Sequence, residues 1–135
     1  MADIKGSCRC HKVSYVSSAE PVFVGVCHCR TCQKSTGSAY ATVVAVPTAS
    51  LTVTGTTKRF DDIGDSGGAT HRDFCPNCGS TVAQFVDVME GITMVPAGTL
   101  DDPDSVKPAM QIYCDSALPW AQLGADVPSF PKMPS

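Results

Sequence analysis

The spacing of the cysteines constrains this chain more than any other feature of its sequence. Eight of the 135 residues are cysteine, and seven of them fall into three short groups. The groups are Cys8-Arg-Cys10, Cys27-His-Cys29-Arg-Thr-Cys32 and Cys75-Pro-Asn-Cys78-Gly79, and Cys114 stands alone. Four disulfides would require secretion, to which nothing in the sequence points. Short, regular spacing of thiols is instead typical of metal ligands.

Two of the cysteine pairs predict a closed, structural zinc site. Such a site takes four thiolate or imidazole ligands, usually as two close pairs from separate turns. Cys75-x-x-Cys78 has the form of a zinc knuckle, in which the following Gly79 permits a tight backbone. Cys8-x-Cys10 supplies the second pair. A zinc ion held by both pairs would tie the start of the chain to its middle and contribute directly to folding stability.

The remaining close group, Cys27, Cys29 and Cys32, predicts a second zinc site that keeps one position open for water or substrate. Three thiolates on Zn²⁺ give a net charge near −1, which makes the metal a weak Lewis acid. Such a centre is poor at making hydroxide and better suited to a soft, sulfur-bearing substrate. The alternative is a second closed site, completed by Cys114 or by a histidine.

The candidates for that fourth ligand are not expected to bind metal. His28 lies between two ligands, so in an extended stretch its side chain should point away and be packed or solvated. His71 lies in a strand-like run, where a satisfied structural role is more common. Cys114 ends a strand-like segment and is expected to be a buried small hydrophobe.

Short runs rich in valine and threonine predict a mostly-β fold with antiparallel pairing, in a single domain over residues 1–135. One or two helical turns could follow Cys29 or Asp101. The segment from Leu118 has four prolines and should form an extended strap. The predicted strands are 11–16, 22–26, 40–46, 51–54, 70–74, 81–86, 92–95 and 110–113.

The charge and hydropathy exclude several kinds of partner. The formal net charge is −3 and the basic residues are scattered, which argues against nucleic-acid binding. No apolar run approaches the roughly 20 residues of a membrane span. The start of the chain also lacks the basic and apolar pattern of a secretory signal. We therefore expect a cytoplasmic protein whose partner is a small molecule or another protein.

Together, these motifs resemble the glutathione-dependent formaldehyde-activating family, which also includes the domain of centromere protein V. The resemblance begins at Gly-Ser-Cys8-Arg-Cys10-His-Lys-Val-Ser-Tyr and continues through Cys27-His-Cys29-Arg-Thr-Cys32-Gln-Lys-Ser-Thr-Gly37 and Phe74-Cys75-Pro-Asn-Cys78-Gly79-Ser. It extends to Ala97-Gly98-Thr-Leu-Asp101-Asp102 and Leu118-Pro119-Trp120, so it covers nearly the whole chain in the right order.

The resemblance implies an antiparallel β-tent fold with one structural and one catalytic zinc. Cys8, Cys10, Cys75 and Cys78 would hold the structural ion, and Cys27, Cys29 and Cys32 the catalytic one. The implied activity is that of a carbon–sulfur lyase, which reversibly adds the glutathione thiol to formaldehyde and gives S-hydroxymethylglutathione. Because glutathione carries two carboxylates, we expect its contacts near the second site. The candidates are Arg30, Lys34, Ser35 and Thr36, although a solvated loop face is an equally good interpretation of them.

The chain departs from the family pattern at three positions. His11 stands where many members have glycine, which leaves open a turn with positive φ there. Gln111 replaces a frequent histidine, and Ala117 replaces a frequent basic residue. A substrate other than glutathione would be one consequence. The alternative function is a non-catalytic binding or scaffold module with two structural zinc sites.

Overall fold

The computed structural model describes residues 3–121, 123–124 and 126–134. These residues form ten β-strands, one α-helix (α1, Arg30–Thr36) and four short 3₁₀ turns. The strands are β1 (Ile4–Ser7), β2 (Ser14–Ser17), β3 (Phe23–Cys27), β4 (Ala41–Pro47), β5 (Leu51–Thr54), β6 (Lys58–Ile63), β7 (Ala69–Phe74), β8 (Thr81–Val86), β9 (Ile92–Pro96) and β10 (Met110–Ile112). The predicted mostly-β fold is confirmed.

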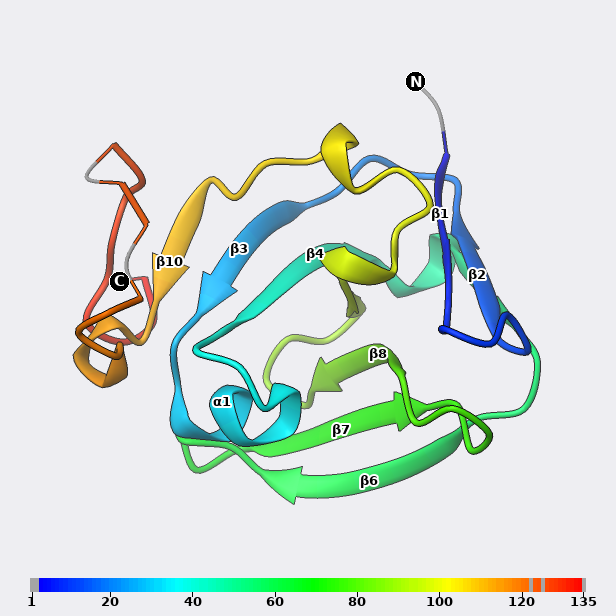
Figure 1. Cartoon of the computed structure of the whole chain (residues 1–135), viewed down its shortest axis with the longest axis horizontal. Helices are drawn as coiled ribbons and strands as arrows, with labels where there is room; N and C mark the ends of the chain where they lie inside the picture. The colour runs from blue at the N-terminus through cyan, green and yellow to red at the C-terminus, as the bar shows by residue number, and fades with distance from the viewer. Residues whose placement is uncertain (1–2, 122, 125, 135) are drawn as a thin grey trace.

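The strands form two sheets. A small sheet has the order β1-β2-β5, and a large one has the order β10-β3-β4-β9-β8-β7-β6. Figure 1 shows the large sheet bending round, with β3 and β4 on one side, β6 and β7 on the other, and α1 at the end between them. The predicted antiparallel pairing holds throughout both sheets except between β10 and β3, which run parallel.

The predicted strand ranges lie close to the observed ones, with one wrong start and two omissions. The range 11–16 begins too early, because residues 8–13 form a turn that the Cys8 N–H to Val13 C=O hydrogen bond closes at 2.9 Å. His11 takes φ +67° in this turn. Histidine is one of the residues that tolerate this conformation, so the turn is kept without the glycine. Strands β1 and β6 were not predicted.

The hydrophobic core lies between the two sheets. Val44, Val46, Val82 and Val95 of the large sheet are fully buried, and Ile4 and Tyr15 of the small sheet pack in the same cluster. Cys8 and Cys75 belong to this cluster, at 1% and 0% exposure. The loops that carry these two cysteines are therefore held together inside the core rather than at the surface.

The C-terminal strap is present in the described residues beyond Leu118. Ser129 forms a parallel bridge with Gln111 of β10. The Gln111 N–H donates to the Pro128 C=O at 2.9 Å, and the Phe130 N–H donates to the Gln111 C=O at 3.0 Å. The strap thus extends the edge of the large sheet beyond β10, as Figure 1 shows on the left of the view.

Candidate metal sites and the adjoining cavity

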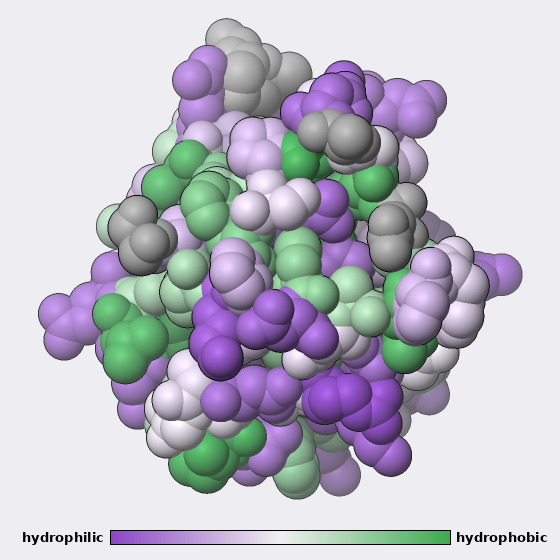
Figure 2. Space-filling model, turned by 90° about the vertical axis from the view of Figure 1, so that its left-hand side faces the viewer, coloured by the Kyte–Doolittle hydropathy of each residue, from purple (hydrophilic) through white to green (hydrophobic). Residues whose placement is uncertain are grey.

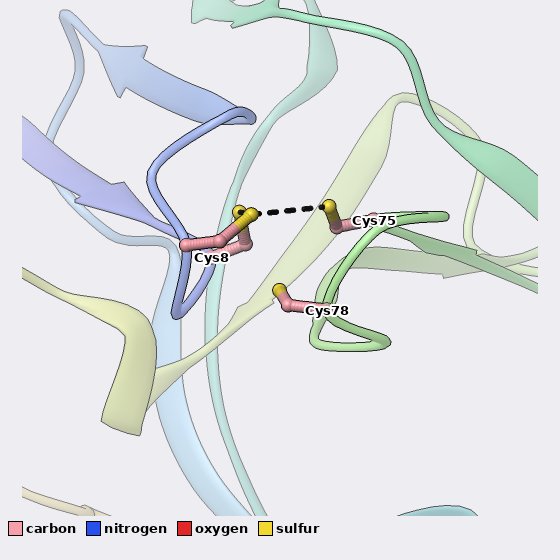
Figure 3. Close-up of side chains that lie close together, drawn as sticks. Cys8, Cys75 and Cys78 are labelled. Atoms are coloured by element: carbon pink, nitrogen blue, oxygen red, sulfur yellow. Dashed lines mark hydrogen bonds between the residues drawn. The ribbon is translucent and has the colours of Figure 1, made fainter.

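Four cysteines from two loops meet in the first candidate metal site. Figure 3 shows the labelled Cys8, Cys75 and Cys78 side chains converging on one small space from the loops after β1 and β7. The Sγ atoms of Cys8, Cys10, Cys75 and Cys78 all lie within 4.8 Å of one another. The Cys8–Cys10 and Cys10–Cys75 sulfur distances are 3.6 and 3.7 Å. Tetrahedral zinc with bonds of about 2.3 Å separates its sulfurs by about 3.8 Å, so these residues fit a zinc ion.

Amide groups around these sulfurs favour the thiolate form. The N–H groups of Val13 and Asn77 point at the Sγ atoms of Cys8 and Cys75, at 3.3 and 3.4 Å. Gly79 takes φ +81°, as the knuckle requires, and its N–H donates to the Cys75 C=O at 2.8 Å. Hydrogen bonds with the side chain and backbone of Ser80 lower the pKa of Cys78 to about 5. A thiol so prepared is ready to bind a cation.

The second candidate metal site lies where β3 passes into α1. Cys27 ends β3, Cys29 is the N-cap of α1, and Cys32 lies in its first turn. Their Sγ atoms also lie within 4.8 Å of one another. The Cys29 sulfur accepts the Cys32 N–H at 3.3 Å, as a serine or aspartate does at other helix N-caps. The tight turn between strand and helix therefore brings three near neighbours in sequence to one point.

The three thiols cannot all ionise without a cation. S–H groups of Cys27 and Cys32 donate to the Cys29 sulfur and lower the pKa of Cys29 to about 3. The same contact with Cys29 raises the pKa of Cys27 to about 12, and contact with Cys27 raises that of Cys32. The group therefore holds one thiolate by itself. A bound divalent ion removes the repulsion and allows all three to ionise.

Asp65, in the loop between β6 and β7, attaches that loop to the start of α1. Its carboxylate accepts the Arg30 N–H at 2.8 Å, the Thr31 N–H at 3.3 Å and the Thr31 hydroxyl at 2.6 Å. The Thr31 hydroxyl, followed by the two amides, lowers the pKa of Asp65. This carboxylate therefore fixes the helix turn that carries Cys29 and Cys32.

The three-cysteine site opens into a cavity of about 190 Å³ on the inner face of the large sheet. Cys27, Cys29 and Cys32 all line it, whereas none of the four core cysteines does. Every strand of the large sheet contributes to the wall, as does α1. The apolar side chains include Phe23, Val43, Phe85, Met94, Met110 and Ile112. The two metal sites thus differ in their surroundings, because one is packed against the core and the other faces a cavity.

A second, more open hollow of about 370 Å³ adjoins this cavity. Thr31, Ser35, Phe60, Asp65 and Arg72 line both. The predicted contacts Arg30 and Lys34 line the hollow only. The hydroxyl of Thr36, the fourth predicted contact, donates to the Cys32 C=O at 2.8 Å, and Thr36 lines neither space. The structure therefore brings three of the four candidates to the site, and their contact with a substrate stays a prediction.

His28 and His71, the histidines considered as a fourth ligand, lie outside both groups of metal-binding cysteines. His28 is fully buried, with its Nε2 atom 2.9 Å from the Gln111 Oε1 atom and its ring edge-on to Tyr40. Both nitrogens of His71 are held by carboxylates, at 2.6 Å by Asp61 and at 2.7 Å by Asp87.

Cys114 is half-buried, and its sulfur contacts the Gln111 C=O at 3.7 Å. It belongs to neither group of sulfurs in the part of the chain that the structure describes. Gln111 itself points to His28 rather than into the cavity, which its neighbours Met110 and Ile112 line. Gln111 therefore supports the metal-binding turn and forms no part of the cavity wall.

The cavity wall also contains two residues that the sequence did not predict there, Tyr113 and Arg72. Tyr113 has φ +55°, an uncommon conformation for a large residue. Burial raises the pKa of Tyr113, and negative charge on Cys27 and Cys29 raises it further. Arg72 lies over the Phe60 ring at 5.3 Å and forms no ion pair with the described residues. No motif or hydrophobic alternation in the sequence marks Tyr113 or Arg72 as a residue of the site.

Figure 2 views the molecule from the side of β10 and the strap. Hydrophobic residues gather over the middle of this face, between hydrophilic ones above and below. Several cavity-lining side chains are unusually exposed, namely Phe60 (48%), Val88 (77%) and Met133 (46%). Apolar surface therefore continues from the cavity to the outside. In the described residues, no helix has both the length and the hydropathy of a membrane span.

Comparison with known proteins agrees with this architecture. A structure of a Rhodobacter sphaeroides protein, a structural-genomics target, superposes with a TM-score of 0.58 and 18% sequence identity. The match covers 77% of this chain and 91% of that one, and at this identity it shows a shared fold. A search of the curated proteins gave no match. The sequence model of the glutathione-dependent formaldehyde-activating enzyme matches residues 3–116. Because this match spans well over half of the chain and includes both cysteine sites, the chain belongs to the glutathione-dependent formaldehyde-activating enzyme family.

Proposed function

We propose that the protein is a zinc-dependent carbon–sulfur lyase that forms and cleaves the adduct of a thiol with an aldehyde. The family match favours glutathione as the thiol and formaldehyde as the simplest aldehyde, giving S-hydroxymethylglutathione. The observation that carries the proposal is the contrast between the two cysteine groups. Cys8 and Cys75 lie in the core with the partly buried Cys10 and Cys78 packed against it, away from the cavity, while Cys27, Cys29 and Cys32 line a cavity that a substrate could enter.

The three cysteines suit a soft substrate atom. Their donor set fits zinc, which when bound would supply a soft Lewis acid beside the cavity. Cleavage of the adduct breaks the carbon–sulfur bond, and its electron pair goes to sulfur. The hydroxyl on the same carbon loses its proton and becomes the carbonyl oxygen. The released thiolate takes up a proton, so the reaction needs no oxidant or reductant.

The neighbouring side chains can assist this reaction. The Tyr113 hydroxyl, on the cavity wall near Cys27 and Cys29, is a donor for the oxygen that changes between hydroxyl and carbonyl. Arg30, Lys34 and Arg72 around the adjoining hollow match the two carboxylates of a tripeptide thiol. Asp65 would hold the α1 turn, and with it the ligands, in place.

The test adds zinc-loaded protein to glutathione and ¹³C-formaldehyde. Exchange NMR then measures the rate at which the labelled carbon passes between free formaldehyde and the glutathione adduct. We expect acceleration over buffer that the Cys29→Ala variant loses. A Lys58→Ala variant, at the exposed edge of β6 and outside both spaces, should keep it. Equal exchange with and without the wild-type protein would refute the formaldehyde reaction. The alternative, a scaffold with two closed zinc sites, gains no support from Cys114, because its sulfur lies outside the three-cysteine group.

A further inference from the structure

We propose that the cavity beside the three-cysteine site binds an apolar, aldehyde-derived group of several carbon atoms, while the polar thiol carrier stays outside it. This assignment rests on the proposed lyase function and specifies its substrate. The preferred adduct would therefore derive from a larger apolar aldehyde rather than from formaldehyde.

The cavity wall is made for apolar contact. Four of the five methionines in the chain line it: Met89, Met94, Met110 and Met133. Methionine is flexible and polarisable, and surfaces rich in it accept apolar ligands of varied shape. Phe23, Phe85 and Ile112 add to these, and most of the exposed surface of the wall is apolar, although Thr70, Gln84 and Tyr113 also line it. His71 touches the cavity too, but both its ring nitrogens are already held by Asp61 and Asp87.

The register of the sheet explains this grouping. Met110 of β10, Gly25 of β3 and Val43 of β4 are direct partners and form one row across the sheet. Gly25 has no side chain to fill the centre of that row. A Cβ atom there would lie only 3.3 Å from the Met110 Cγ atom. The glycine therefore leaves room for the Met110 side chain, and a larger residue would push that side chain into the cavity that both residues line.

The volume does not match formaldehyde. A cavity of about 150 Å³ in another protein accommodates benzene, which has six carbons. At about 190 Å³, this cavity can take an aliphatic or aromatic group of similar size. The carbon and oxygen of formaldehyde would leave most of it empty, and an unfilled apolar space forgoes the contacts that an apolar group would gain.

Two of the three cations near the site lie outside the cavity. Arg30 and Lys34 line the adjoining hollow alone, and Arg72 lies on the wall between the two spaces. Thr31 and Ser35 of α1 line both spaces, and Cys32 lies between them in the helix. An adduct with its sulfur at the cysteines would thus direct an apolar group into the cavity and the carboxylates of its thiol part to the cations.

The test compares two stable thioethers, S-methylglutathione and S-hexylglutathione, which share the peptide and differ only in the group that would enter the cavity. Zinc-loaded protein with ¹³C-methyl methionine is titrated with each. We expect S-hexylglutathione to bind at least about tenfold more tightly, because burial of five further methylenes is favourable. It should also shift the Met94 and Met110 signals. Affinities within about twofold of each other, or no methionine shift, would overturn the assignment.

A variant that fills the cavity tests independently whether the hexyl group binds there. Gly25→Val should remove most of the preference for the hexyl ligand and leave binding of the methyl ligand nearly unchanged. Thr52→Val, on the exposed face of the small sheet, should retain the full preference. If Gly25→Val does not fold, the wild-type comparison alone decides.

Failure of the lyase proposal is distinguishable from failure of this assignment. Acceleration of formaldehyde exchange without a hexyl preference would retain the lyase and reject the apolar substrate. A hexyl preference with methionine shifts, but without turnover of any adduct, would support the apolar site and reject the lyase.

Discussion

The Nε2 atom of His28 lies 2.9 Å from the Oε1 atom of Gln111, although the two residues are 83 positions apart in the chain. His28 is the residue between the ligands Cys27 and Cys29, and Gln111 lies in β10. The amide of Gln111 also donates to the Ser129 hydroxyl at 2.9 Å. One buried side chain thus joins the metal-binding turn to the C-terminal strap.

Replacement of Gln111 by leucine should destabilise the protein. The variant leaves the buried His28 without the partner of its Nε2 atom, and its Nδ1 atom already has none among the described residues. An unsatisfied buried polar group costs about 1–3 kcal/mol, so the free energy of unfolding in urea should fall by that amount. Ser129 is exposed, so water can replace its hydroxyl beside the Gln111 amide, and Ser129→Ala should cost less than about 0.5 kcal/mol. Equal losses in the two variants would contradict this role of Gln111.

The two metal sites should respond differently to loss of a ligand. Cys75→Ser removes a ligand in the core, so we expect loss of one zinc and of the folded state together. Cys29→Ser should also lose one zinc but keep most of the β-sheet signal, because the three-cysteine site lies at the cavity wall. Metal content per chain and circular dichroism measure the two effects. Unfolding of Cys29→Ser to the same extent would mean that both sites are structural.

The eighth cysteine should be dispensable for metal binding. Its sulfur contacts the Gln111 C=O and lies outside both groups of ligands. We therefore expect Cys114→Ala to retain two zinc ions per chain by elemental analysis, and to retain any activity. Loss of one ion would mean that Cys114 closes the second site on metal binding, and the proposal of an open position would fail.

Asp65 should tune the second metal site without binding the ion. Asp65→Ala removes the acceptor of two amides and one hydroxyl at the start of α1, which frees the turn that carries Cys29 and Cys32. Loss of such a supporting contact typically lowers metal affinity by about 10–100-fold. Competition with a chelator measures this, and Asp65→Asn, which keeps an acceptor oxygen, should recover part of the affinity. Asp62→Ala, in the adjoining hollow, serves as the control and should bind zinc as the wild type does.

The sequence alone was sufficient for the parts of this molecule that obey local rules. Ligand spacing identified both cysteine groups because a metal ion demands close sulfur atoms whatever the fold. Valine-rich and threonine-rich runs located most strands, because β-branched residues favour the extended backbone of a sheet. Strand β6 was missed because Lys58–Ile63 is rich in charged residues and lies at the edge of the sheet. Its side chains are mostly exposed, so the sequence shows no alternation of apolar and polar residues there. Strand β1 was missed because it is short and contains Gly6.

The cavity could not be predicted from the sequence for a different reason. Phe23, Met94 and Met110 are apolar strand residues that in most sheets would simply form core. Only the bending of the large sheet, visible in Figure 1, makes them surround a space. Arg72 and Asp65 reach the three-cysteine site for the same reason, because the β6–β7 hairpin folds over α1. These contacts depend on sheet curvature, which no spacing of residues along the chain encodes directly.

The ion pairs of His71 predict a specific dependence of stability on pH. Hydrogen bonds to Asp61, and then to Asp87, raise the pKa of His71 above its usual value of 6.5. The protonated ring is therefore stabilised in the folded state, and this contribution is complete below the unfolded pKa and lost as pH rises through the folded one. The destabilisation caused by His71→Gln should accordingly be greatest below the unfolded value of 6.5 and decrease as the pH rises through the raised folded pKa. Urea unfolding of the zinc-loaded wild type and variant at each pH measures the difference, in which the pH dependence of metal binding largely cancels. Asp61→Asn should reproduce the direction of the effect, and a destabilisation that grows with rising pH would show that His71 is held as the neutral ring.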